Sequence, residues 1–189
     1  MKKLLFSILI FLAPVLASAQ LTTINPDTVC YQDPTSNYQV PALGAGYTYT
    51  WTVAAPGVIT SGQGTNAIVV NWSAAAPGLI PNGVSVYATN ASGCQTPPIN
   101  LNVFILQVIP VITPLGPFCL NEPCDNLIAV PPGGVWSGPG VAAGEFCPQV
   151  AGIGNHVITY TYTLAGCVFT TTTNVIVDDV PSLSPIQHD

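Results

Sequence analysis

Large apolar residues alternate with polar ones over several stretches of this chain, with a period of two. Residues 47–53 (YTYTWTV) place Tyr47, Tyr49, Trp51 and Val53 on one side and threonine on the other, which is the pattern of a half-buried β-strand. Three further strands are predicted, with core-facing residues Ile68, Val70 and Trp72, then Val84, Val86 and Ala88, then Ile99, Leu101, Val103 and Ile105. Glycine, proline and asparagine separate these strands, and this spacing predicts an antiparallel sandwich.

The pattern repeats in the second half of the chain. Residues 84–94 (VSVYATNASGC) align without a gap on residues 157–167 (VITYTYTLAGC), and the SGQG of residues 61–64 matches the SGPG of residues 137–140. We therefore expect two copies of a small all-β domain. One conflict stays open: Tyr87 lies off the Val84/Val86 face, whereas its partner Tyr160 shares a face with Ile158. Either a bulge reconciles the two copies or the facing is wrong in one of them.

The N-terminus has the pattern of an export signal. Lys2 and Lys3 precede an apolar run over residues 4–16, and Ala-Ser-Ala at 17–19 provides a cleavage site. The predicted organisation is a signal peptide at 1–19, a first sandwich at 20–107, a stiff proline-rich linker at 108–117, a second sandwich at 118–178 and a C-terminal segment at 179–189. The apolar run is shorter than the ~20 residues that span a bilayer as a helix, and no second run of that length follows in the sequence, so no membrane insertion is expected after signal cleavage.

Charge excludes several classes of partner. The only basic residues are Lys2 and Lys3, so the chain after cleavage carries eight carboxylates and no Lys or Arg. Nucleic-acid binding and adhesion to an anionic membrane surface both lack their usual cations. Six cysteines in an exported chain predict disulfide bonds in preference to a metal site or a catalytic thiol.

No catalytic constellation is present, so we expect a protein that is not an enzyme. No serine lies in a G-x-S-x-G motif. His156 follows Gly-Asn at the start of a predicted strand, and we expect a turn histidine with a satisfied hydrogen bond. No cofactor is expected either. Calcium, bound with the help of Asp178 and Asp179, is the alternative, although adjacent residues of an extended chain point to opposite sides. Trp136 beside the glycine turn is either a core residue or, with Tyr162, a platform for stacking on a sugar ring.

Two motifs resemble known repeats. Residues 49–53, 61–72 (SGQGTNAIVVNW) and 84–90 resemble the PKD-like repeat of Bacteroidota surface proteins, and residues 133–141 (GGVWSGPGV), Phe146, Pro148 and residues 156–160 resemble the Ig-like repeat of the same proteins. Such repeats build gliding and attachment adhesins that the type IX secretion system exports. The resemblance implies two small Ig-like and PKD-like antiparallel β-sandwich domains in tandem, stapled by disulfides and without catalytic residues.

Two departures from that family accompany the resemblance, and the first is that Cys147 lies inside the usual Phe-x-Pro element, where with Cys124 it suggests an extra bridge. Those adhesins carry many repeats and a C-terminal sorting domain, so we expect an N-terminal fragment, a truncated product or a small protein with its own role. Asp27-Thr28-Val29 also resembles the O-glycosylation signal of this phylum, which makes Thr28 a candidate glycosylation site.

The repeat predicts how the six cysteines pair. Cys94 and Cys167 occupy the same position after the aligned strand, while Cys30 and Cys119 each open their own domain. The predicted bridges are therefore Cys30–Cys94 and Cys119–Cys167, and Cys124–Cys147 is the pair that remains.

The leading hypothesis is a non-enzymatic protein, secreted or at the cell surface, that acts as a stalk, an adhesin segment or a filament subunit. Its expected partners are other copies of itself or further repeat domains, because Lys is not available to guard its edge strands against pairing. Residues 21–24 and the C-terminal segment 179–189 are the candidate donors of such a pairing, and the former is the more strand-like. A carbohydrate-binding module that contacts surface glycans through exposed aromatics is the alternative, and a secreted hydrolase is the third class.

Overall fold

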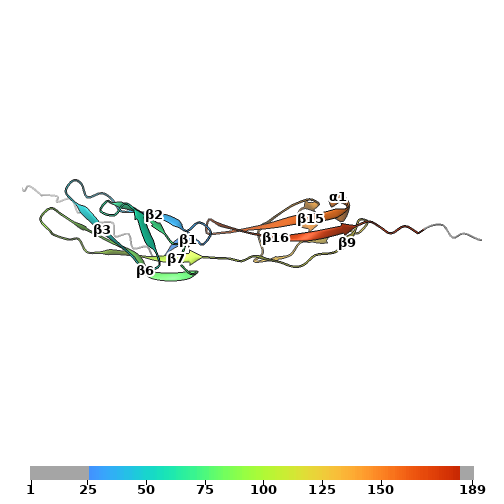
Figure 1. Cartoon of the computed structure of the whole chain (residues 1–189), viewed down its shortest axis with the longest axis horizontal. Coiled ribbons are helices and arrows are strands. Elements are labelled where there is room, and N and C mark those ends of the chain that lie inside the picture. Colours follow the sequence, from blue (N-terminus) through green and yellow to red (C-terminus); the bar gives the residue numbers. More distant parts are fainter. Residues whose placement is uncertain (1–25, 184–189) are drawn as a thin grey trace, which may run out of the picture.

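The computed structural model describes residues 26–183, and two β-sandwiches follow one another end to end in it (Figure 1). All six cysteines lie in this range. The predicted signal peptide, the strand-like residues 21–24 and His188 lie outside the described residues. Within residues 26–183, no helix has the length and apolar character needed to cross a membrane.

The first sandwich is built from two sheets. One has the order β1 (Asp27–Cys30), β7 (Ile99–Leu106), β6 (Gly78–Thr89) and β3 (Thr48–Val53), and the other has the order β2 (Thr35–Gln39), β5 (Ala67–Asn71) and β4 (Val58–Ser61). The opening strand β1 runs parallel to the closing strand β7, and all other pairs are antiparallel.

The predicted core of this domain is largely confirmed. Trp51, Trp72 and Ile68 are buried together, as are the strand residues Val70, Val84, Val86, Ala88, Val103 and Ile105. Tyr47 and Ile99 were predicted to face the core, but they are 38% and 47% exposed. Tyr47 precedes β3 and Ile99 is the first residue of β7. The alternating sequence pattern therefore extends beyond the region where the opposite sheet covers these side chains.

The loop after β4 joins the two sheets through Gln63. The Trp51 backbone N–H donates to Gln63 Oε1 at 3.0 Å, and Gln63 Nε2 donates back to the Trp51 carbonyl at 2.9 Å. The indole Nε1 of Trp51 donates to the Thr65 carbonyl at 2.8 Å. The SGQG motif is thus a turn whose Gln63 side chain hydrogen-bonds to the backbone of Trp51 in β3.

The second sandwich repeats this plan with shorter strands around a central hairpin that is at least as long as that of the first. Its main sheet has the order β12 (Val135–Ser137), β15 (Gly154–Leu164), β16 (Cys167–Asp178) and β9 (Phe118–Cys119), and β9 runs parallel to β16. Facing it are β10 (Asp125–Asn126), β14 (Glu145–Phe146) and β13 (Val141–Ala142), the pair β11 (Ala129–Val130) and β8 (Val111–Ile112), and the single-turn helix α1 (Pro148–Ala151). Phe118, Phe146, Ile158, Val175 and Val177 form its core.

The conflict over the aligned strands has a clear outcome. Ile158 and Tyr160 are buried and Val157 is 52% exposed, whereas its aligned partner Val84 is buried. The ungapped alignment therefore matches residues that face opposite ways, because a shift of one residue moves every side chain to the other face of a sheet.

Part of the predicted linker forms a β-strand of the second sandwich. Val111 and Ile112 form β8 and pair with Val130 and Ala129 of β11, and the Thr113 N–H donates to the Ile128 carbonyl at 2.9 Å. The prolines of this segment flank the pairing residues and leave their N–H groups available. The second sandwich therefore begins inside the segment predicted as a linker.

Candidate functional site

A disulfide joins the two sandwiches where they meet. Cys30, the last residue of β1, is bonded to Cys167, the first residue of β16, with a Cα–Cα distance of 5.4 Å across 137 residues of sequence. Cys167 is only 1% exposed. The two domains are therefore connected at two points, by the backbone after β7 and by this bridge.

The predicted pairings Cys30–Cys94 and Cys119–Cys167 are wrong, and the direction of the opening strands explains why. Because β1 is parallel to β7, Cys30 lies opposite Leu106 at the end of β7, whereas Cys94 precedes the start of that strand. The eight residues of β7 separate the two cysteines by roughly 23 Å or more. A disulfide needs Cα atoms within about 7 Å.

The second domain has the same geometry. Cys119 lies opposite Asp178, the last residue of β16, and Cys167 is the first residue of that strand. Eleven residue steps place them about 36 Å apart. Cys94, which is exposed, and Cys119, which is half-buried, are the two free cysteines.

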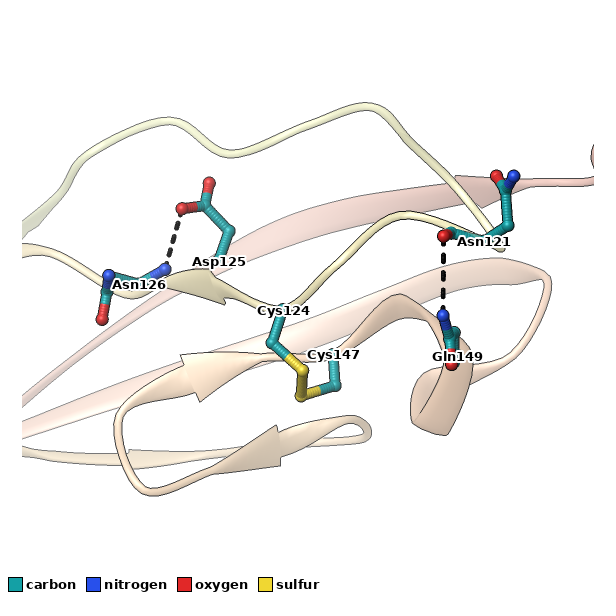
Figure 2. Close-up of a disulfide and its surroundings, with 6 residues drawn as sticks. All are labelled: Asn121, Cys124, Asp125, Asn126, Cys147 and Gln149. Atoms are coloured by element: carbon teal, nitrogen blue, oxygen red, sulfur yellow. Dashed lines mark hydrogen bonds between the residues drawn. A yellow bond between two sulfur atoms is a disulfide. The ribbon is translucent and has the colours of Figure 1, made fainter.

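The predicted bridge Cys124–Cys147 is present and lies within the second domain (Figure 2). It fastens the residue before β10 to the residue that precedes α1, and Gln149 Nε2 of that helix donates to the Asn121 carbonyl at 3.5 Å. Glu145 and these two cysteines make up the one group of potential metal ligands found among residues 26–183. Both sulfur atoms are in the disulfide, so they do not provide the thiolates that a metal would need.

Asp178 and Asp179, the predicted calcium ligands, are both exposed at the end of β16. The Asp179 carboxylate accepts a hydrogen bond from the Val180 N–H at 2.8 Å. Neither aspartate belongs to the group of potential metal ligands described above.

Trp136 lies against the core of the second domain. It pairs with Tyr160 across β12 and β15, the two ring centroids are 4.6 Å apart, and its side chain is half-buried. Tyr162, the next residue on that face of β15, is also half-buried. The two predicted glycan contacts therefore do not form an exposed pair of stacking rings.

The two glycines before Trp136 have different roles: Gly133 has a positive φ of 93°, and Gly134 allows close packing. The Tyr160 hydroxyl donates to the Pro131 carbonyl at 2.6 Å and accepts from the Gly134 N–H at 2.7 Å. A Cβ on Gly134 would lie 2.5 Å from the Thr161 carbonyl oxygen and from Tyr160 Cζ. The second glycine of the GG-x-W motif is thus explained by the close approach of this loop to a buried tyrosine, and the first by its left-handed backbone.

Two further predicted residues have defined surroundings. Thr28, the candidate glycosylation site, is exposed on β1. His156 Nε2 donates to the Gly152 carbonyl at 2.8 Å, so the predicted hydrogen bond is present, but the residue is the third of β15 and does not lie in a turn. Beside Thr28, Asp27 lies close to the Tyr38 phenol, and burial, followed by this carboxylate, raises the pKa of Tyr38 well above its ordinary value.

Comparison with known proteins gives one family match, and it covers the first sandwich. Residues 17–103 match the family described as PKD-like domain. Among curated proteins, none matches the chain. Among solved structures, extracellular domains 3–5 of Drosophila OTK are similar, with 16% identity and a TM-score of 0.35 over 81% of this chain and 59% of that structure. The titin Ig tandem domains A164-A165 have 10% identity and a TM-score of 0.26 over 82% of this chain and 93% of that one. At these scores neither likeness bears on function.

Proposed function

We propose that this chain is a non-enzymatic structural or adhesive protein of the cell exterior, and that it acts as a stiff two-domain spacer. The observation that carries this proposal is the Cys30–Cys167 bridge between the sandwiches. A single peptide connector leaves two domains free to swivel, and relative motion is the default for tandem domains. A second covalent connection beside the first removes most of that freedom.

The location follows from the same chemistry. Disulfides persist in oxidising compartments outside the cytosol, and the predicted signal peptide would deliver the chain there. The resemblance to Bacteroidota adhesin repeats supports a role at the cell surface, with further repeats or other copies as partners. Thr28 is exposed, as O-glycosylation requires.

Carbohydrate binding through exposed aromatics is the weaker alternative. Tyr31 and Tyr47 are the exposed aromatic residues among those that the structure describes. The Tyr31 N–H donates to the Leu106 carbonyl at the junction end of the first domain, whereas Tyr47 precedes β3 at the opposite end. They form no row along which a glycan chain could stack.

Small-angle X-ray scattering on residues 20–189 tests the spacer. The intact protein should give one extended particle of roughly 70–80 Å, about the length of two 12-residue strands in line. The double variant Cys30→Ser/Cys167→Ser should give a broader distribution of distances with a shorter mean. The matched control, Cys124→Ser/Cys147→Ser, removes a bridge inside one domain and should keep the extended profile. A bent intact protein, or one whose profile the first variant leaves unchanged, would contradict the proposal.

A further inference from the structure

The two free cysteines lie at opposite ends of the molecule, in positions that correspond to those of the bridged pair. Cys30 and Cys119 are each the last residue of an opening strand, and each lies opposite the last residue of its closing strand, Leu106 and Asp178 respectively. Both cysteines therefore mark the same end of their own domain, which we call the tail.

Backbone hydrogen bonds extend this correspondence beyond the cysteines. After Cys30, the Tyr31 N–H donates to the Leu106 carbonyl at 3.0 Å, and the Asp33 N–H donates to the Cys30 carbonyl at 3.0 Å. After Cys119, Leu120 and Glu122 make the equivalent bonds, at 2.9 and 3.1 Å, to the carbonyls of Asp178 and Cys119. The sequences agree as well, since residues 30–34 read CYQDP and residues 119–123 read CLNEP.

Cys94 and Cys167 mark the other end of each domain, which we call the head. Both belong to the hairpin that connects the last two long strands, β6 to β7 and β15 to β16. Cys167 pairs directly with Leu164, while Cys94 precedes Gln95, which forms a bridge with Thr89. The hairpin in the first domain is longer, and Asn90 Oδ1 holds it by accepting from the Cys94 N–H at 2.9 Å.

The junction inside the chain is thus a bond from the tail of one sandwich to the head of the next. The tail of the second sandwich and the head of the first keep their cysteines free. We propose that copies of this chain join head to tail, through a disulfide between Cys119 of one copy and Cys94 of the next. This inference rests on the proposed structural role and names the partner as a second copy of the chain.

Geometry and charge both favour a bond between copies. The two free thiols are separated by the lengths of both domains, roughly 60 Å from the strand lengths, so they cannot pair within one copy. Residues 87–99 around Cys94 and residues 157–172 around Cys167 carry no charge, while the tail of the first domain carries Asp33 and that of the second carries Glu122, Asp178 and Asp179. In the Cys30–Cys167 junction and in the proposed Cys119–Cys94 junction alike, an acidic tail therefore meets a neutral head, and no like charges repel each other.

The bond forms by exchange with a disulfide-bonded oxidant of the exterior, such as an oxidised dithiol oxidoreductase or a small-molecule disulfide. The Cys94 thiolate attacks that disulfide, forms a mixed disulfide and releases one thiolate. Cys119 of the neighbouring copy then attacks Sγ of Cys94 and releases the second thiolate. Two protein thiols lose two protons and two electrons, and the oxidant is reduced to two thiols.

The test uses residues 20–189 with both native disulfides intact and a glutathione redox buffer. The unmodified chain should form a ladder of oligomers on non-reducing gels, and peptide mapping should find Cys94 joined to Cys119. An equimolar mixture of Cys94→Ser and Cys119→Ser chains, one of them labelled with ¹⁵N, should stop at the dimer. The mixed dimer should exceed either homodimer by about tenfold, against the twofold excess of random pairing.

Three results would overturn the proposal: a chain that stays monomeric under oxidation, bridges between identical cysteines, or a mixed dimer at the random proportion. The double variant Cys94→Ser/Cys119→Ser separates this failure from that of the spacer. If this variant keeps the extended scattering profile while the unmodified chain does not polymerise, the spacer stands and the head-to-tail bond is wrong.

Discussion

Replacing both Cys30 and Cys167 with serine should destabilise the two domains together. With the first domain folded, Cys30 is held opposite Leu106. If the second domain unfolds with the bridge intact, the chain between Leu106 and Cys167 becomes a closed loop of about 60 residues. Cutting the bridge frees that loop and so increases the entropy of the unfolded state.

The size of the effect follows from the loop. In the chain-entropy account of disulfides, closing a loop of about 60 residues is worth about 4 kcal/mol at 25 °C. The same reasoning applied to the first domain gives a loop of about 80 residues, from Cys30 to β8, and a similar free energy. With a urea dependence of about 1 kcal/mol/M for domains of this size, each unfolding midpoint should fall by about 4 M.

Fluorotryptophan NMR during a urea titration reads the two domains separately. Trp51 and Trp72 lie in the first core, and Trp136 packs on the second. The background for all variants is Cys94→Ser/Cys119→Ser, which prevents thiol exchange. If a domain with the bridge intact has a free energy of unfolding below about 4 kcal/mol, the variant without the bridge should show the unfolded signal of that domain even without urea. That result also agrees with the prediction.

The matched control is Cys124→Ser/Cys147→Ser. That bridge spans 23 residues within the second domain, so its loss should cost about 3 kcal/mol there and leave the Trp51 and Trp72 transitions unchanged. Coupling through Cys30–Cys167 would be refuted if its loss left both midpoints in place, or if it shifted the Trp136 transition alone as the control does.

Three more predictions concern single side chains. Tyr160→Phe leaves the Pro131 carbonyl and the Gly134 N–H without their partner, so thermal or urea unfolding should show a loss of about 1–3 kcal/mol, while Tyr162→Phe in the same assay should change little. Gly134→Ala should lower the melting temperature of the second domain and leave that of the first unchanged, because its Cβ would meet Thr161 and Tyr160 at 2.5 Å; a stable variant would show that the loop can move away. Burial raises the pKa of Tyr38 above its ordinary 10.0, so stability of the first domain should be complete below that pH and decline as pH rises past it; urea midpoints in alkaline buffers should show this slope and Tyr38→Phe should remove it.

The sequence by itself determined the strands and most of the core. Trp51, Val70 and Ile158 are buried where a period of two predicts them, because alternation is a local property that the pleated backbone imposes on neighbouring residues. The same local reasoning found the turns and the repeat of a small all-β domain. The bridge Cys124–Cys147 was predicted as the pair left over from two wrong pairings, and it is present because its partners lie close together within one domain.

The tertiary structure alone decided which ends of the domains the other cysteines occupy. A repeat shows that Cys30 and Cys119 are equivalent, but it does not show whether an opening strand runs parallel or antiparallel to its closing strand. The parallel pairing of β1 with β7 places Cys30 at the far end from Cys94 and next to the following domain. Strand direction and domain stacking depend on contacts between residues far apart in sequence, and the pattern of side chains along one strand does not record them.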